Sequence, residues 1–401
     1  MSITVTNFIR MAESSCMITA VEGVKCYGVK EGKYGLGVVV CKGKVAGVFT
    51  KNRFKAAPVI VTQEHVKSGE IEGIIVNSGN ANAFTGEEGL KNAKKMAELL
   101  ARKLGVPTHK IAVASTGVIG VQLDMDWIER KFEDVFSKLG TSREHALSFA
   151  RAIMTTDSFP KECLIETDGF KIAGVAKGAG MIAPNMATML AFIFTDADFE
   201  PDELQEMLRK AVNESFNVTV VDGDTSTNDM VLLVAMGKKR VDKRFFEQKL
   251  TELCINLAKM IARDGEGATK FMEVVVKGAK SDEEAFKAAK TVASSLLVKT
   301  ALFGNDPNWG RIIAALGYSG IEVSENLDLS IEGFKDGKSV GVVELVRDGE
   351  SMRSEEKAKE LIKKSDEILF KINLKVGNGK GYAFGCDLSY DYVRINSEYT
   401  T

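Results

Sequence analysis

Apolar and polar residues follow two different periods along this chain, so strands and helices are both expected throughout. The segments 38–50 (VVVCKGKVAGVFT) and 73–79 (GIIVNSG) are short and rich in β-branched residues, which predicts buried strands. From Thr85 to Leu104 the apolar residues recur at helical spacing, which predicts an amphipathic helix. Between 368 and 376 apolar residues alternate with largely polar ones, the pattern of a strand with one face in water.

Further helices are expected at 202–213, 244–263, 282–300 and 354–364. Two of the expected helices begin with the sequence of a capping box, in which a hydroxyl residue is followed three positions later by glutamate. These pairs are Thr85 with Glu88 and Ser281 with Glu284.

Strands and helices are mixed from end to end, without a repeat or a low-complexity linker, which indicates an α/β fold. A doubly wound nucleotide-binding fold is not supported, because no G-x-G-x-x-G motif joins a strand to a helix. The segment GFKDGKS at 333–339 has three residues between its glycines where a phosphate-binding loop has four. It is therefore interpreted as a hairpin turn.

Composition narrows the function classes. The 401 residues carry 53 basic and 55 acidic side chains, so no electrostatic footprint for nucleic acid or an anionic membrane is present. An apolar share of 45% is enough to build a sizeable core. No apolar run approaches the roughly 20 residues that span a bilayer, and the N-terminal segment lacks the pattern of a signal peptide. A cytoplasmic protein without nucleic-acid or membrane partners is expected.

Cysteine and histidine usage removes several kinds of site. No C-x-x-C pair is present, so zinc and redox motifs are not supported and buried free thiols are expected. The histidines lie in polar segments away from the glycine-rich blocks, which argues against a Ser/His/Asp triad. The residues concerned are Cys16, Cys26, Cys41, Cys163, Cys254 and Cys386, and His65, His109 and His145.

The segment 177–190, KGAGMIAPNMATML, places a threonine between a glycine-rich, proline-marked turn and an apolar strand. One interpretation is an ordinary buried strand after a loop. The other is that Thr188 is a nucleophile whose base is its own α-amine, freed by cleavage between Ala187 and Thr188. Such an amine has a pKa of about 7.7 to 8.0, and a nearby ammonium such as that of Lys177 would lower it.

A series of ordered blocks favours the second interpretation, because together they resemble one family. They extend over nearly the whole chain, and the family they resemble is the ornithine acetyltransferases, the glutamate N-acetyltransferases of arginine biosynthesis. The blocks are VNSGNANAFTG (76–86), ASTGVIG (114–120), MTTDSFPK (154–161), KGAGM with ATML (177–190), DGDTSTND (222–229), DGEGATK (264–270) and GNDPNWGRI (304–312).

The resemblance implies a fold and a processing event. The fold is a four-layered αββα sandwich with two central sheets between helical layers, with a smaller domain at roughly 280–380. Cleavage before Thr188 gives an α chain, 1–187, and a β chain, 188–401, which together build the core sandwich and assemble as two of each.

The resemblance also implies the site. Thr188 is the nucleophile, and the Thr116 hydroxyl with the Gly117 amide forms an oxyanion hole, although the two residues alone would also fit a β-turn. The expected substrate contacts are Thr155, Lys177, Thr188, Glu266, Asn396 and Thr401. Local chemistry leaves a plain N-cap or ST-turn open for Thr155, and a frayed tail open for Asn396 and Thr401. Lys177 suits a carboxylate and Glu266 suits the ornithine ammonium.

The expected reaction moves an acetyl group from N2-acetylornithine to glutamate by a ping-pong mechanism. Family members differ in whether they also accept acetyl-CoA, and no residue here decides it. No metal or cofactor is expected, because DGDTSTND fails the EF-hand pattern and is interpreted as a structural turn. Two alternatives stay open: a self-cleaving aminopeptidase or amidase that passes the acyl group to water, and a binding protein in which Thr188 is structural.

Overall fold

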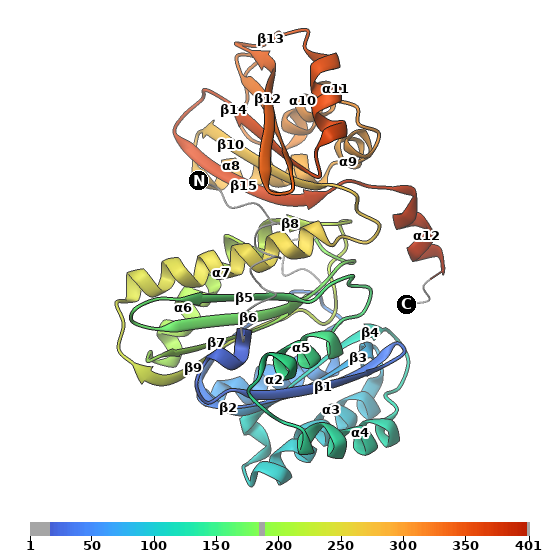
Figure 1. Cartoon of the computed structure of the whole chain (residues 1–401), viewed down its shortest axis with the longest axis vertical. Coiled ribbons are helices and arrows are strands. Elements are labelled where there is room, and N and C mark those ends of the chain that lie inside the picture. The colour runs from blue at the N-terminus through green and yellow to red at the C-terminus, as the bar shows by residue number, and fades with distance from the viewer. Residues whose placement is uncertain (1–16, 184–188, 399–401) are drawn as a thin grey trace. The chain divides into compact units, whose positions relative to one another are not determined.

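The computed structural model describes residues 17–183 and 189–398, and the chain divides into two compact units (Figure 1). The N-terminal unit contains the described residues of 17–217 together with 224–257. The C-terminal unit contains 218–223 and the described residues from 258 onward. Each unit is built around one sheet.

The N-terminal unit holds an eight-stranded sheet in the order β4-β3-β2-β9-β7-β6-β5, with β1 paired to β2. The pairs β3/β4 and β7/β9 are parallel, and the other pairs are antiparallel. The strands are β1 (Lys25–Glu31), β2 (Tyr34–Phe49), β3 (Glu70–Asn80), β4 (Ile111–Val118), β5 (Lys161–Glu166), β6 (Lys171–Lys177), β7 (Leu190–Ala197) and β9 (Met230–Lys239). The helices are α2 (Ala57–His65), α3 (Gly86–Leu104), α4 (Met125–Ser137), α5 (Arg143–Ala152), α6 (Pro201–Asn213) and the start of α7 (Lys243–Arg263).

Strand β2 divides this sheet into two halves. Its first part pairs with β1 and β3, and after a register shift between Val40 and Gly43 its last part pairs with β9. Side chains alternate across β2, so Val39 faces a core shared with Phe192 of β7, whereas Val38 faces a core shared with Phe132 of α4. The two halves therefore pack on each other through one core, and helices cover the outer face of the first half.

The outer face of the second half is also covered by a helix. A Cβ atom at Gly174 of β6 would lie 2.8 Å from the Leu257 side chain of α7, so the two elements are in close contact. Figure 1 shows α7 along β5 and β6 on one side of this unit, and α3 and α4 near β1 and β2 on the other. The order of layers is helix, half-sheet, half-sheet, helix, as expected for a four-layered α/β sandwich.

The C-terminal unit holds a seven-stranded sheet in the order β13-β12-β11-β14-β10-β15-β8. Its strands are β8 (Thr219–Val220), β10 (Phe271–Ala279), β11 (Asp328–Lys335), β12 (Lys338–Arg347), β13 (Glu350–Ser351), β14 (Glu367–Asn373) and β15 (Gly379–Cys386). Its helices are α8 (Asp282–Ser294), α9 (Leu296–Phe303), α10 (Trp309–Tyr318), α11 (Glu355–Lys364) and α12 (Tyr390–Glu398). The expected α/β class with two sheets is confirmed.

Most elements expected from periodicity are confirmed, including the helices α3, α6, α7 and α11 and the strands β2, β3 and β14. The 333–339 segment is the β11–β12 hairpin. Asp336 and Gly337 form its two-residue turn, with φ of 50° and 77°. Both angles lie in the left-handed region, as a type I′ turn requires.

Two local predictions were wrong. The expected helix 282–300 is two helices, because Ser295 is extended (ψ 114°) and its hydroxyl accepts from the Val298 N–H to start α9. Thr85 makes no capping hydrogen bond, because its hydroxyl donates to the Asn82 side-chain oxygen at 2.7 Å. At the second predicted cap, the Ser281 hydroxyl accepts from the Glu284 N–H, as expected.

The described cysteines are buried and free, as the spacing predicted, and Cys16 lies outside the described residues. Burial raises the pKa of the Cys41 thiol to about 12, which keeps it protonated and unreactive at neutral pH. Within the described ranges, no helix has the length and apolar character needed to cross a membrane.

Candidate active site

Thr116 and Gly117 lie at the end of β4, within the strand and not in the β-turn that the two residues alone would also fit. The reason is that pairing with β3 continues to Val118, and Gly117 lies opposite Gly79. Gly117 has φ +134°, and a Cβ atom there would lie 2.3 Å from the Gly79 carbonyl carbon. Only glycine fits this position, and the close approach leaves a strand end without a side chain beside Thr116.

Lys177, the last residue of β6, contacts two other predicted site residues. Its Nζ donates to Thr116 Oγ1 at 3.1 Å and to Thr155 Oγ1 at 2.7 Å, and the side chain is 3% exposed. Thr155 lies in the turn after α5. The ends of β4 and β6 and this turn therefore meet at one buried lysine, and the hydroxyl of Thr155 contacts Lys177 rather than capping a helix.

A carboxylate that the sequence analysis did not single out holds this arrangement together. Asp157 accepts from the Thr155 N–H at 3.0 Å, the Gly178 N–H at 2.7 Å and Lys161 Nζ at 2.6 Å, and Lys177 Nζ lies 4.0 Å away. Burial alone would raise the pKa of Asp157, but the two lysines and the hydrogen bonds outweigh it and hold that pKa well below its usual range. The four-residue spacing of Asp157 and Lys161 in MTTDSFPK is the sequence feature from which this ion pair could have been predicted.

The cluster carries more positive than negative charge. Lys161 is fully buried and its Nζ lies 2.6 Å from Asp157, whereas Lys177 Nζ lies 4.0 Å from the same carboxylate. Lys30 of β1 adds a third ammonium; its Nζ donates to Ser78 Oγ at 2.9 Å and also to the Met154 carbonyl. Burial and repulsion by Lys177 lower the pKa of Lys30 to about 8. Lys30, Lys161 and Lys177 lie around Asp157, and burial raises the pKa of the other nearby carboxyl group, Asp229, which favours its neutral form. Among the described residues this excess of positive charge favours an anionic ligand or a developing oxyanion.

The C-terminal unit brings together another predicted pair. Asn396 Nδ2 donates to Glu266 Oε2 at 2.8 Å. Asn396 lies in α12, so the alternative of a frayed tail does not hold at this residue. The loop that carries Glu266 is tied to the segment before α12, because Ser389 Oγ donates to the Gly267 carbonyl at 2.6 Å.

Ala187, Thr188 and Thr401 lie outside the described residues. The first described residue after the predicted nucleophile is Met189, whose N–H donates to Asp229 Oδ1 at 3.0 Å. Asp229 is fully buried. Burial raises its pKa well above the usual value, although the Met189 hydrogen bond, Lys177 and Thr50 act in the opposite direction.

Two of the histidines have defined contacts away from these groups. His65 Nδ1 lies 2.7 Å from the Ile111 carbonyl oxygen, and His145 Nδ1 lies 2.6 Å from Ser142 Oγ. His109 lies in the short turn before β4. None of these contacts joins a histidine to Thr116, Thr155 or Lys177, which fits the argument against a histidine-based triad.

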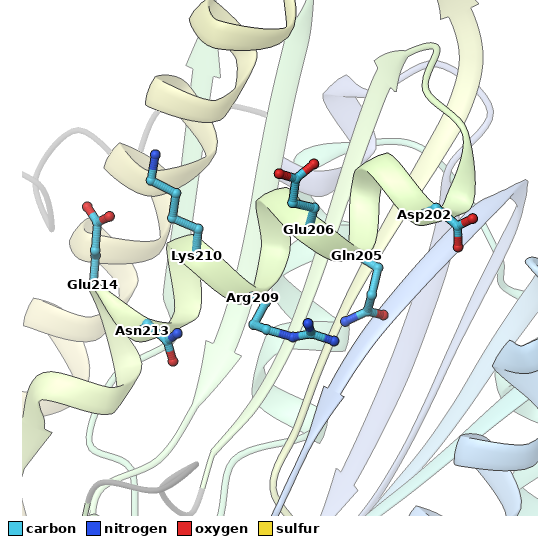
Figure 2. Close-up of a pocket in the computed structure, with 7 residues that line it drawn as sticks. All are labelled: Asp202, Gln205, Glu206, Arg209, Lys210, Asn213 and Glu214. Atoms are coloured by element: carbon cyan, nitrogen blue, oxygen red, sulfur yellow. The ribbon is translucent and has the colours of Figure 1, made fainter.

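Two hollows elsewhere contain none of the predicted site residues. One, of about 450 Å³, runs along α6 (Figure 2). Its charged side chains include Lys210, paired with Glu247, and Glu206, paired with Lys243 at 2.9 Å, which is typical of a solvated helix face. It is lined by Asp202, Gln205, Glu206, Arg209, Lys210, Asn213 and Glu214. The other, of about 350 Å³, is lined in part by Trp309, whose Nε1 donates to Glu355 at 3.2 Å.

One known protein family matches nearly the whole chain. Residues 20–401 match the ArgJ family. The "Arginine biosynthesis bifunctional protein ArgJ" of Archaeoglobus fulgidus is 55% identical over 384 residues, covering 96% of this chain and 100% of the relative. The "Glutamate N-acetyltransferase" of Methanosarcina mazei is 48% identical over 393 residues, covering 96% and 98%. A solved ArgJ protein from Bacillus halodurans is 46% identical, covering 51% of this chain and 96% of its own, with a TM-score of 0.47.

Proposed function

The chain belongs to the ArgJ family, and we propose that it transfers the acetyl group of N2-acetylornithine to glutamate, giving ornithine and N-acetylglutamate. The observation that carries this proposal, beyond family membership, is the buried cluster of Thr116, Thr155 and Lys177. In this cluster, Thr116 at the end of β4 can donate to an oxyanion, and the Lys177 ammonium suits a substrate that carries a carboxylate. The enzyme is an acyltransferase of arginine biosynthesis.

Maturation is proposed to use the Thr188 hydroxyl. Its oxygen attacks the Ala187 carbonyl, the peptide C–N bond breaks, and the nitrogen takes a proton to become the free amine of Thr188. The Ala187–Thr188 ester that forms is then hydrolysed by water, which leaves the Ala187 carboxylate and restores the hydroxyl. The freed amine is the base that the scarce histidines do not supply.

Turnover is proposed to use the same hydroxyl. It attacks the acetyl carbonyl of N2-acetylornithine while the Thr188 amine takes its proton, and ornithine leaves with that proton on its nitrogen. The glutamate amine then attacks the carbonyl of the acetyl-threonine ester and the ester C–O bond breaks. The Thr188 oxygen takes the proton that the glutamate amine gives up, which regenerates the hydroxyl. Because the Lys177 ammonium already donates to Thr116 Oγ1, the Thr116 proton is free to point elsewhere. It can donate to the oxyanion together with the Gly117 N–H.

The remaining predicted residues are proposed to bind substrate. Lys177 and Thr155 suit the carboxylate, and Glu266 with Asn396 and Thr401 suits the ornithine side chain. No metal or redox cofactor enters the proposed chemistry, and acetyl-CoA stays a second candidate donor. We also propose a cytoplasmic assembly of two α and two β chains.

The proposal is tested by product analysis. Purified protein is incubated with N2-acetylornithine and glutamate, and N-acetylglutamate, free acetate and ornithine are quantified. N-acetylglutamate formed in equal amount to ornithine supports acetyl transfer. Free acetate formed without N-acetylglutamate would instead favour the hydrolase of similar fold. A parallel incubation with acetyl-CoA in place of acetylornithine decides the second donor.

Thr116→Val is expected to lower kcat by about 10²- to 10³-fold, the usual cost of losing one oxyanion donor. Valine keeps the β-branched shape at this buried position but has no hydroxyl. Thr116→Ser keeps the donor and is expected to retain most of the activity. Steady-state kinetics with acetylornithine, on protein whose cleavage is first verified by intact mass, measures both variants. Wild-type kcat in the valine variant would remove Thr116 from the oxyanion role.

A further inference from the structure

The motif DGDTSTND, interpreted from the sequence as a structural turn, ends in two buried side chains that reach both parts of the proposed catalytic machinery. We propose that Asn228 and Asp229 are positioning residues that hold the Thr116–Gly117 strand end and the strand following Thr188 in a fixed mutual arrangement. The inference rests on the proposed function, because it assigns a role within the same site.

Asn228 holds the oxyanion side. Its Nδ2 donates to the Ala81 carbonyl at 2.6 Å and to the Ser115 carbonyl at 2.8 Å, and Ser115 directly precedes Thr116. Its Oδ1 accepts from Thr227 Oγ1 at 2.6 Å. Both amide protons and the amide oxygen are therefore used, which fixes the orientation of the side chain.

The place that Asn228 joins is one where the sheet ladder is irregular. The β3/β4 register shifts at Gly79 and Asn80, next to Thr116 and Gly117. Strand β4 is also the edge of its sheet. Buried carbonyl groups at such a place need donors from outside the ladder, and Asn228 supplies two. Removing the amide would leave the carbonyl before Thr116 without this donor.

Asp229 and its neighbour hold the nucleophile side. Asp229 Oδ1 accepts from the Met189 N–H at 3.0 Å, and the Met230 N–H donates to the Met189 carbonyl at 3.1 Å. Both backbone groups of Met189, the residue bonded to Thr188, are thus held by consecutive residues. Among residues 17–183 and 189–398, Asp229 Oδ2 is buried and has no hydrogen-bond partner, and leaving a buried polar atom unsatisfied costs free energy.

The turn itself is anchored, so the two side chains do not move independently. Thr50 Oγ1 donates to the Ser226 carbonyl at 2.7 Å, and the Ala56 N–H donates to the Thr227 carbonyl at 3.0 Å. The Thr50 N–H donates to the Asp229 carbonyl at 3.0 Å. Asn228 and Asp229 are adjacent on one anchored turn, and they contact β4 beside Thr116 and the residue that precedes β7. A misplacement of about 1 Å between such groups can cost ~10²-fold in rate.

The test is a double-mutant cycle between Asn228→Ala and Thr116→Val. Asn228→Ala is expected to lower kcat by roughly 10²-fold with little change in KM, because it displaces the oxyanion donor without touching substrate. In the Thr116→Val background the same change is expected to cost much less, because the donor it positions is already gone. Asn213→Ala, on the exposed face of α6, is the matched control and is expected to behave as wild type.

Full additivity of the two losses, or wild-type kcat in Asn228→Ala, would overturn the proposal. If Asn228→Ala does not unfold cooperatively, Asn228→Ser, which keeps one donor, takes its place in the cycle.

For Asp229, the Ala variant is expected to slow self-cleavage, which is followed by intact mass spectrometry, and the Asn variant is expected to restore it. Equal cleavage by wild type and Asp229→Ala would overturn the positioning role of Asp229. Absence of acetyl transfer by the wild-type protein would instead contradict the proposed function. Failure of the positioning role and failure of the proposed function can therefore be told apart.

Discussion

Thr188→Ala is expected to yield one uncut chain of 43.6 kDa that transfers no acetyl group. The variant lacks the hydroxyl that is proposed both to attack the Ala187 carbonyl and to carry the acetyl group. Loss of the nucleophile in an acyl-transfer enzyme costs on the order of 10⁴-fold or more, so activity should fall below detection. Intact mass spectrometry under denaturing conditions and the N-acetylglutamate assay measure the two effects.

Thr188→Ser is the matched control. It keeps the hydroxyl but loses the β-branch that restricts χ1, so it is expected to cut itself and to retain part of the activity. Cleaved and active Thr188→Ala protein would refute the nucleophile assignment. A wild-type protein that remains a single chain would remove the proposed base and leave the binding-protein alternative ahead.

Asp157→Asn is expected to lower the free energy of unfolding by about 3 to 5 kcal/mol, the cost of leaving a buried charge without its partner. Lys161 is fully buried and its Nζ lies 2.6 Å from the Asp157 carboxylate. The variant therefore leaves this buried ammonium without its carboxylate. Urea denaturation followed by circular dichroism measures the change. Asp168→Asn, at an exposed loop position, is the control and is expected to change stability by less than about 0.5 kcal/mol.

The double variant Asp157→Asn with Lys161→Met is expected to recover most of the lost stability, since removing both charges removes the desolvation cost. An Asp157→Asn protein as stable as wild type would show that the pair contributes nothing. The pH dependence has a defined sign. Because the folded pKa of Asp157 lies below its unfolded value of about 3.9, its stabilisation is present above that pH and is lost as the pH falls further.

Much of the fold was predictable because burial imposes a period on the sequence. The stripe from Leu90 to Leu104 gave α3, and the alternation after Ile368 gave β14, since each pattern depends only on near neighbours. The same logic failed at Ser295, where an extended backbone and a serine cap split one apolar stripe into two helices. A hydroxyl residue that caps a helix cannot be distinguished in the sequence from one that does not, because the difference depends on the hydrogen-bond partner.

The candidate site divides in the same way. Thr116, Gly117, Thr155 and Lys177 were identified from ordered motifs, and the structure brings all of them to adjoining strand ends and one turn. Asp157 and Lys161 were not identified, although they belong to the same motif as Thr155. Nothing in residue type distinguishes a buried ion pair from an exposed one, because the distinction depends on what packs around it.

The sequence by itself determined much of the secondary structure, the α/β class, the family and the residue types available for catalysis, since these follow from local period and from motifs that are contiguous in the chain. Only the tertiary structure decided which polar groups meet. Lys177 and Thr116 are 61 positions apart, and Asn228 and Ala81 are 147 apart. Such contacts arise where strand ends and turns converge in a buried sheet, and no local pattern encodes them. Single hydrogen bonds between distant segments have no period, so they become visible only once the chain has folded.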